Sequence, residues 1–147
     1  IPSGHMGATE NIYNQMDARA AGREGTVIRA GVKPNSQWAG VVWQSPEGDW
    51  GEKDGGFQII GAKKLVFWAK GLAGGEQVKF EFGILARTAK FYDSATGSMT
   101  VTLTKDWKEY SFDLAGKDLS RIKTGFCWVV APPPQGVTFY LDDIRYE

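Results

Sequence analysis

The sequence predicts an all-β protein, an antiparallel sandwich of two sheets. Short segments of alternating apolar and polar residues recur along the chain, and Gly- and Pro-rich turn signals separate them about every 8–12 residues. No stretch keeps the apolar period of an amphipathic helix. Asp17–Glu24 and Ala115–Arg121 are each expected to form at most a turn or two of helix.

The elements follow in order from these patterns. Residues 7–24 are polar and weakly patterned, and we expect one short strand there. Eight strands are predicted after them: Thr26–Val32, Trp38–Gln44, Lys64–Lys70, Gln77–Ile84, Met99–Thr104, Glu109–Leu114, Gly125–Ala131 and Val137–Tyr146. Since alternate side chains of a strand share one face, we expect five aromatic residues to be buried between the sheets: Phe80, Phe82, Trp107, Phe112 and Phe139.

Length and charge limit the possible functions. The 147 residues fit one domain, long enough to bury about two-thirds of its unfolded surface. The 17 basic and 17 acidic residues are spread along the chain, so no basic block favours nucleic acid as a partner. No apolar run approaches the ~20 residues of a membrane helix. The single cysteine, Cys127, cannot form an internal disulfide.

The first six residues, IPSGHM, look like a cloning remnant, which leaves residues 7–147 as the domain. A natural secretion signal could have been removed together with the segment that this remnant replaces. The remnant also holds His5, the only histidine, so histidine chemistry is effectively excluded.

Four of the six tryptophans lie in residues 31–71, among predicted strands and turns. Trp43 and Trp50 flank a loop rich in Gly and Pro, and Trp38 opens the strand that leads into it. Such indoles either complete a core or offer flat faces to a ligand.

Sugar rings would suit such faces. The C–H face of a sugar stacks on an indole, and its hydroxyls need amide or carboxylate partners, which Gln44, Asp49 and Glu52 could supply. The alternative is that Trp43 points inward with Val41 and that Trp50 only closes the end of the sandwich.

Three motifs resemble signatures of jelly-roll carbohydrate-binding modules of the galactose-binding-like type. They are Leu65–Gly71 (LVFWAKG), Thr104–Tyr110 (TKDWKEY) continuing to Asp113 and Leu114, and Thr138–Ile144 (TFYLDDI). The resemblance extends from about Thr26 to the end of the chain, and its motifs are largely scaffold. It implies a jelly-roll fold and non-catalytic glycan binding by a monomeric module, joined to other domains of a secreted or cell-surface, glycan-active parent protein.

The resemblance also bears on the remaining tryptophans. It marks Trp107 as a packing residue, which agrees with its place in the expected core. It favours packing for Trp68 as well, although strand alternation points that indole outward. Trp128 is in phase with Phe126 and Val130, which favours the core, but a concave binding sheet could use its strand, so it remains a secondary sugar-contact candidate.

Modules of this kind often carry a structural Ca²⁺ near the last strand, and Asp142 and Asp143 are the corresponding candidates. Because Ca²⁺ takes six to eight oxygen ligands, two adjacent aspartates are not sufficient, and an ordinary solvated strand end is the alternative.

Two other functions stay open. A glycosidase needs two carboxyl groups across a cleft, but with 17 acidic residues such a pair is expected by chance. The sequence has no nucleophile elbow, metal-binding His/Cys spacing or phosphate loop, so we expect no enzyme. The main alternative is a structural or adhesive domain of an extracellular protein that binds no glycan.

Overall fold

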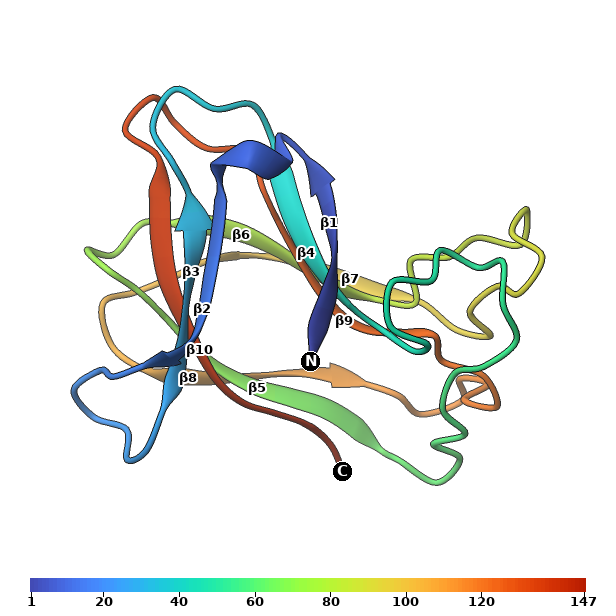
Figure 1. Ribbon diagram of the computed structural model, residues 1–147. Coiled ribbons are helices and arrows are strands. Elements are labelled where there is room, and N and C mark those ends of the chain that lie inside the picture. Colours follow the sequence, from blue (N-terminus) through green and yellow to red (C-terminus); the bar gives the residue numbers. More distant parts are fainter.

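The computed structural model describes all residues from 1 to 147 and contains two five-stranded antiparallel sheets packed face to face (Figure 1). The fold class expected from the sequence is therefore confirmed. The only helical segment is the single 3₁₀ turn η1 (Thr9–Asn11). Helical turns do not form at Asp17–Glu24, where the end of a strand runs into a turn, or at Ala115–Arg121.

The first sheet has the strand order β1-β4-β9-β6-β7. Its strands are β1 (Pro2–Gly7), β4 (Ala39–Gln44), β9 (Thr124–Val130), β6 (Gln77–Phe82) and β7 (Gly97–Thr102). The second sheet has the order β2-β3-β10-β5-β8. Its strands are β2 (Ile12–Ala18), β3 (Val27–Val32), β10 (Val137–Tyr146), β5 (Lys64–Gly71) and β8 (Lys108–Asp113). The eight strands predicted after residue 24 are all present, with shifts of one or two residues at several ends.

Aromatic side chains from both sheets meet in the core. The ring of Phe67 on β5 lies 4.6 Å from that of Phe80 on β6 and 5.1 Å from that of Phe126 on β9. The alternation rule correctly predicted the buried phenylalanines: Phe80, Phe82, Phe112 and Phe139 are all buried. Burying an aromatic side chain of this size stabilises the fold by about 2–3 kcal/mol.

Trp107 does not belong to the core, so that prediction is wrong. It lies immediately before β8, on the outer side of the second sheet, and its indole N–H donates to the carbonyl oxygen of Ala21, 2.9 Å away. Alternation explains the position. Tyr110 and Phe112 face inward, so every odd-numbered residue nearby, including Trp107, faces outward.

The N-terminal segment that looks like a cloning remnant forms an edge strand in the structure. Residues Pro2–Gly7 are β1, and they pair antiparallel with Ala39–Trp43 of the neighbouring strand β4. Ladder hydrogen bonds join backbone groups and require no particular side chains. The composition of the segment therefore gave no sign of this pairing.

Candidate functional site

The six indoles differ sharply in exposure. Trp38 and Trp50 are 49% and 41% exposed, whereas Trp128 is fully buried. Trp43, Trp68 and Trp107 are intermediate. Because an indole is costly to leave in water, the two exposed side chains are the first places to look for a ligand surface.

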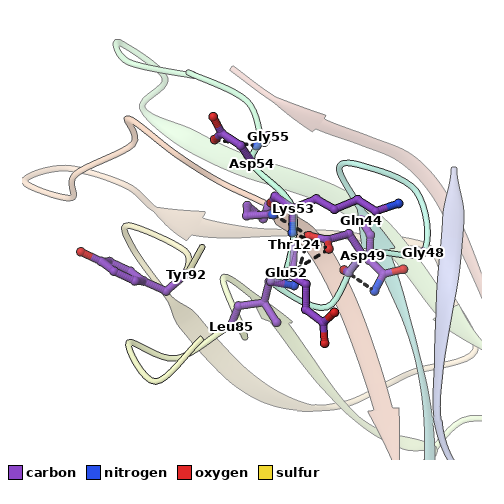
Figure 2. A network of polar contacts seen from close by, with 12 residues as sticks. Gln44, Gly48, Asp49, Glu52, Lys53, Asp54, Gly55, Leu85, Tyr92 and Thr124 are labelled. Carbon is purple, nitrogen blue, oxygen red and sulfur yellow. Dashed lines mark hydrogen bonds and ion pairs between the residues drawn. The ribbon is translucent and has the colours of Figure 1, made fainter. Parts of the chain in front are cut away.

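Trp50 lies on the loop between β4 and β5, and Asp49 fixes the backbone of this loop (Figure 2). The Asp49 carboxylate accepts hydrogen bonds from the backbone N–H groups of Gly51, Glu52 and Lys53, at 3.1, 3.1 and 3.0 Å. Three consecutive amides converging on one carboxylate make a tight turn. Trp50 lies in the chain between Asp49 and the three residues whose amides bind the Asp49 carboxylate, so its backbone position is fixed.

A buried cation completes the turn. The ammonium of Lys123 lies 2.5 Å from Oδ2 of Asp49, and both side chains are almost completely buried. The same ammonium donates to the backbone carbonyl oxygen of Lys53. The ion pair thus connects the start of β9 to both sides of the turn.

Gln44 and Ser3 connect the turn to the first sheet. The side-chain amide of Gln44 donates from Nε2 to the backbone oxygen of Asp49, 2.8 Å away (Figure 2). Its Oε1 accepts from the Ser3 hydroxyl, also at 2.8 Å. Gln44 therefore anchors the loop with the groups that we expected it to offer to a sugar.

The charges at this site are mutually stabilised. Burial alone would raise the pKa of Asp49, but the Lys123 ammonium and the backbone donors outweigh it and lower the pKa to about 2. The carboxylate is therefore ionised at neutral pH. It acts as a structural charge with no tendency to take up a proton there.

A second buried carboxylate, Asp93, fixes the neighbouring loop between β6 and β7. It accepts hydrogen bonds from the backbone N–H of Leu85 at 2.9 Å, from the N–H of Lys123 at 2.5 Å and from the Thr124 hydroxyl at 2.6 Å. The loops after β4 and β6 lie at the same end of the sandwich (Figure 1). Both are therefore held to the start of β9.

Neither Lys123 nor Asp93 was singled out from the sequence. Lysine and aspartate are almost always exposed unless paired. The position of Lys123 directly before an apolar strand was the only available signal, and it did not identify a partner.

Two expected sugar contacts face the protein interior. Trp128 is fully buried, and its indole N–H points to Oδ1 of Asn14 at 3.2 Å, so it is unavailable to a ligand and its candidacy is wrong. Trp43 packs against the core, with its ring 5.2 Å from Phe126 in an edge-to-face arrangement. Trp43 therefore points inward, as the alternative interpretation of the sequence expected.

Trp38 does not share a site with Trp50. It directly precedes β4, whereas Gln44 ends this strand beside the Trp50 loop. Six residues of strand span about 20 Å. Trp38 therefore stays a separate candidate contact at the opposite end of the sandwich.

Both last-strand aspartates that were considered for calcium form ion pairs with arginines. Oδ2 of Asp142 is 2.8 Å from Nε of Arg23, and Oδ2 of Asp143 is 2.5 Å from the Arg145 guanidinium. No group of three or more His, Cys, Asp or Glu side chains in the structure could hold a metal ion. Since Ca²⁺ takes six to eight oxygens, these two carboxylates would supply only part of a site, and calcium binding here stays a prediction.

No family profile and no curated protein match the chain in sequence. Solved structures match it in fold, and several are carbohydrate-binding modules; the fold is the jelly-roll sandwich of this class. A family 30 carbohydrate-binding module is 18% identical, with 100% of this chain and 95% of that chain covered and a TM-score of 0.66.

Two further matches place the fold in other settings. A structure named TmCBM61, solved in complex with β-1,4-galactotriose, is 15% identical over 98% of this chain and 86% of that chain, with a TM-score of 0.60. An exo-β-agarase matches with 11% identity and a TM-score of 0.66, over 93% of this chain but only 23% of the agarase. At these identities the likeness establishes the fold alone. No helix of the structure is both long and apolar enough to cross a membrane.

Proposed function

We propose that the chain is a non-catalytic carbohydrate-binding module whose sugar contact is the indole of Trp50. The observation that carries the proposal is an exposed indole on a loop immobilised by a buried ion pair, in a fold shared with carbohydrate-binding modules. The loop would bind by stacking and hydrogen bonding, without chemistry on the glycan.

A loop that is already ordered raises the affinity for a glycan, whose individual contacts with a protein are weak. Ordering a side chain or loop on binding costs free energy that subtracts from affinity, and a loop that is already ordered avoids this cost. Asp49, Lys123 and Gln44 make contacts that hold the loop in the absence of ligand.

The polar partners for sugar hydroxyls would come from the same loop. Glu52, Lys53 and Asp54 are exposed and follow Trp50 within four residues. Gln44 would hold the loop in place and would not contact the sugar, because both ends of its amide are bonded within the protein.

We further propose that the module belongs to a larger secreted, glycan-active protein and acts as a monomer. The agarase match supports this idea, since the fold there accounts for about a quarter of a longer enzyme chain. The galactotriose complex and the agarase together make β-1,4-galactan and agarose the first glycans to test.

The experiment is affinity electrophoresis through gels containing β-1,4-galactan, agarose or a neutral control polymer, preceded by a glycan array. Trp50→Ala should lose retardation while its melting curve stays close to that of the wild type. Base stacking on aromatic side chains contributes about 1–3 kcal/mol per ring, which suggests a loss of about five- to a hundredfold.

Trp38→Ala is tested in parallel, since it removes the other exposed indole, at the opposite end of the sandwich. It should keep retardation if Trp50 is the contact, and a loss in Trp38→Ala alone would place the contact at Trp38. A Trp50→Ala protein that folds and is retarded like the wild type would refute this site. Absence of binding to any glycan by the wild type would instead favour a structural or adhesive role.

A further inference from the structure

The outer face of the second sheet carries a row of alternating aromatic and basic side chains that the Trp50 site does not use. Arg29 on β3 pairs directly with Tyr140 on β10, and Tyr140 pairs with Lys70 on β5. Trp107, directly before β8, extends the row beyond Lys70. On β2 the register partner of Arg29 is Gln15, and Tyr13 begins the row from a diagonal position two residues away, where its ring contacts Arg29. We call these five residues the aromatic–basic row.

The rings and cations of the row contact one another. The Lys70 ammonium lies 5.3 Å from the ring centre of Tyr140 and 5.9 Å from that of Trp107. The Arg29 guanidinium carbon lies 5.2 Å from the ring centre of Tyr13. Each cation–π contact of this kind is attractive and helps to hold the cation in place.

Tyr13 is seated on the sheet by a glycine. A Cβ at Gly31 would lie 2.5 Å from the Tyr13 hydroxyl oxygen and 2.0 Å from the carbonyl oxygen of Val137. The Tyr13 hydroxyl donates to this same carbonyl oxygen at 3.0 Å. The absent side chain therefore lets the phenol pack against the backbone, which gives the row a fixed end.

The two cations of the row have no acidic partner. No ion pair in the structure includes Arg29 or Lys70. The next row of the same face is neutralised: Arg23 lies over Trp68, 4.7 Å from its ring centre, and binds Asp142 at 2.8 Å. The protein thus compensates charge in one row and leaves two positive charges uncompensated in the adjacent one.

The row has the dimensions of an extended chain ligand. It crosses five strands, and four strand spacings of about 4.8 Å give a length of about 19 Å. Rings would contact the C–H faces of sugars, and the free cations between them would pair with anionic substituents at intervals along the chain. A neutral glycan would leave both charges without a partner.

We propose that the aromatic–basic row is a second glycan-binding surface, selective for acidic polysaccharides that carry carboxylate or sulfate groups. It is separate from the Trp50 site and does not depend on that site. Single-stranded nucleic acid shares the features of stacking surface and negative charge. The jelly-roll fold, which the chain shares with carbohydrate-binding modules, favours the polysaccharide.

Affinity electrophoresis at low salt tests the proposal, with polygalacturonate, dextran sulfate and neutral dextran in parallel gels. We expect retardation by at least one of the two acidic polymers and none by dextran. Arg29→Gln and Lys70→Gln should each weaken binding about two- to fivefold, the scale of exposed ion pairs, and the double variant about tenfold. The polymer that retards the protein identifies carboxylate or sulfate as the recognised group.

Lys63→Gln is the matched control, because Lys63 is exposed and forms no ion pair. Trp50→Ala should retain this binding, which separates the two sites. The proposal is overturned if neither acidic polymer retards the wild type, or if the control weakens binding as much as the row variants. Displacement by an oligo(dT) at lower concentration than by the acidic polymer would also overturn it. Melting curves of all variants confirm that they fold.

Discussion

Replacing Asp49 by Asn should destabilise the protein by about 3–5 kcal/mol, the range for breaking a buried ion pair by removing one partner. Asn retains an oxygen for the backbone donors of the turn, so the loss comes mainly from Lys123, whose ammonium would remain buried without a counter-charge. The entropy of unfolding of a chain of this length is about 0.3 kcal/mol/K. The melting temperature should therefore fall by about 10–16 °C.

Guanidinium denaturation followed by tryptophan fluorescence gives the free energy of unfolding directly. Asp49→Asn, Lys123→Met and the double variant form a cycle. We expect the double variant to be clearly more stable than the sum of the single losses predicts, since it leaves no buried charge unpaired. An Asp49→Asn protein within 1 kcal/mol of the wild type, or strict additivity in the cycle, would refute the assigned role of the ion pair.

Acid should weaken the ion pair between Asp49 and Lys123. The pKa of Asp49 is about 2 in the folded protein, against 3.8 ordinarily. The stabilisation from its carboxylate is therefore complete above about pH 4 and is lost as the pH falls toward 2. A pH series of denaturation midpoints should show this loss for the wild type and a smaller one for the Asp49→Asn/Lys123→Met protein. Trp107→Ala should cost only about 1–2 kcal/mol, against about 3–5 for Phe80→Ala, because the Trp107 indole makes only surface contacts: two cation–π contacts, an edge-to-face contact with Tyr140 and one hydrogen bond. Equal losses of the two variants in chemical denaturation would return Trp107 to the core. Burial raises the pKa of Cys127 to about 12, so iodoacetamide at pH 8 should modify it only after unfolding, and rapid labelling of the native protein would contradict that burial.

Most of the fold could be predicted from alternation alone. The burial of Phe80 and Phe82, with Glu81 between them, follows from the period of a strand, and so does the outward position of Trp68. Trp107 shows the limit of this argument. The resemblance and the expected strand parity both placed it in the core, but Tyr110 and Phe112 face inward, which leaves the odd-numbered position 107 on the outer face.

The candidate site was less accessible to sequence reasoning. The Gly/Pro loop and its exposed indole at Trp50 could be found from composition, but the roles of Gln44 and Lys123 could not. Both depend on which segments meet in space: Gln44 binds a backbone oxygen five residues away, and Lys123 reaches a carboxylate 74 positions earlier. A single sequence shows that a buried charge would need a partner, but it does not show which one.

The cation that closes the Trp50 loop is covalently attached to the chain. A loop organised by a dissolved metal ion is ordered only in proportion to the occupancy of the metal, which varies with the free concentration and is removed by chelators. The ammonium of Lys123 cannot diffuse away, so the occupancy of this cation is the same at any dilution and in any ionic medium. The loop therefore has its shape whenever the protein is folded, and a medium poor in divalent ions leaves that shape unchanged.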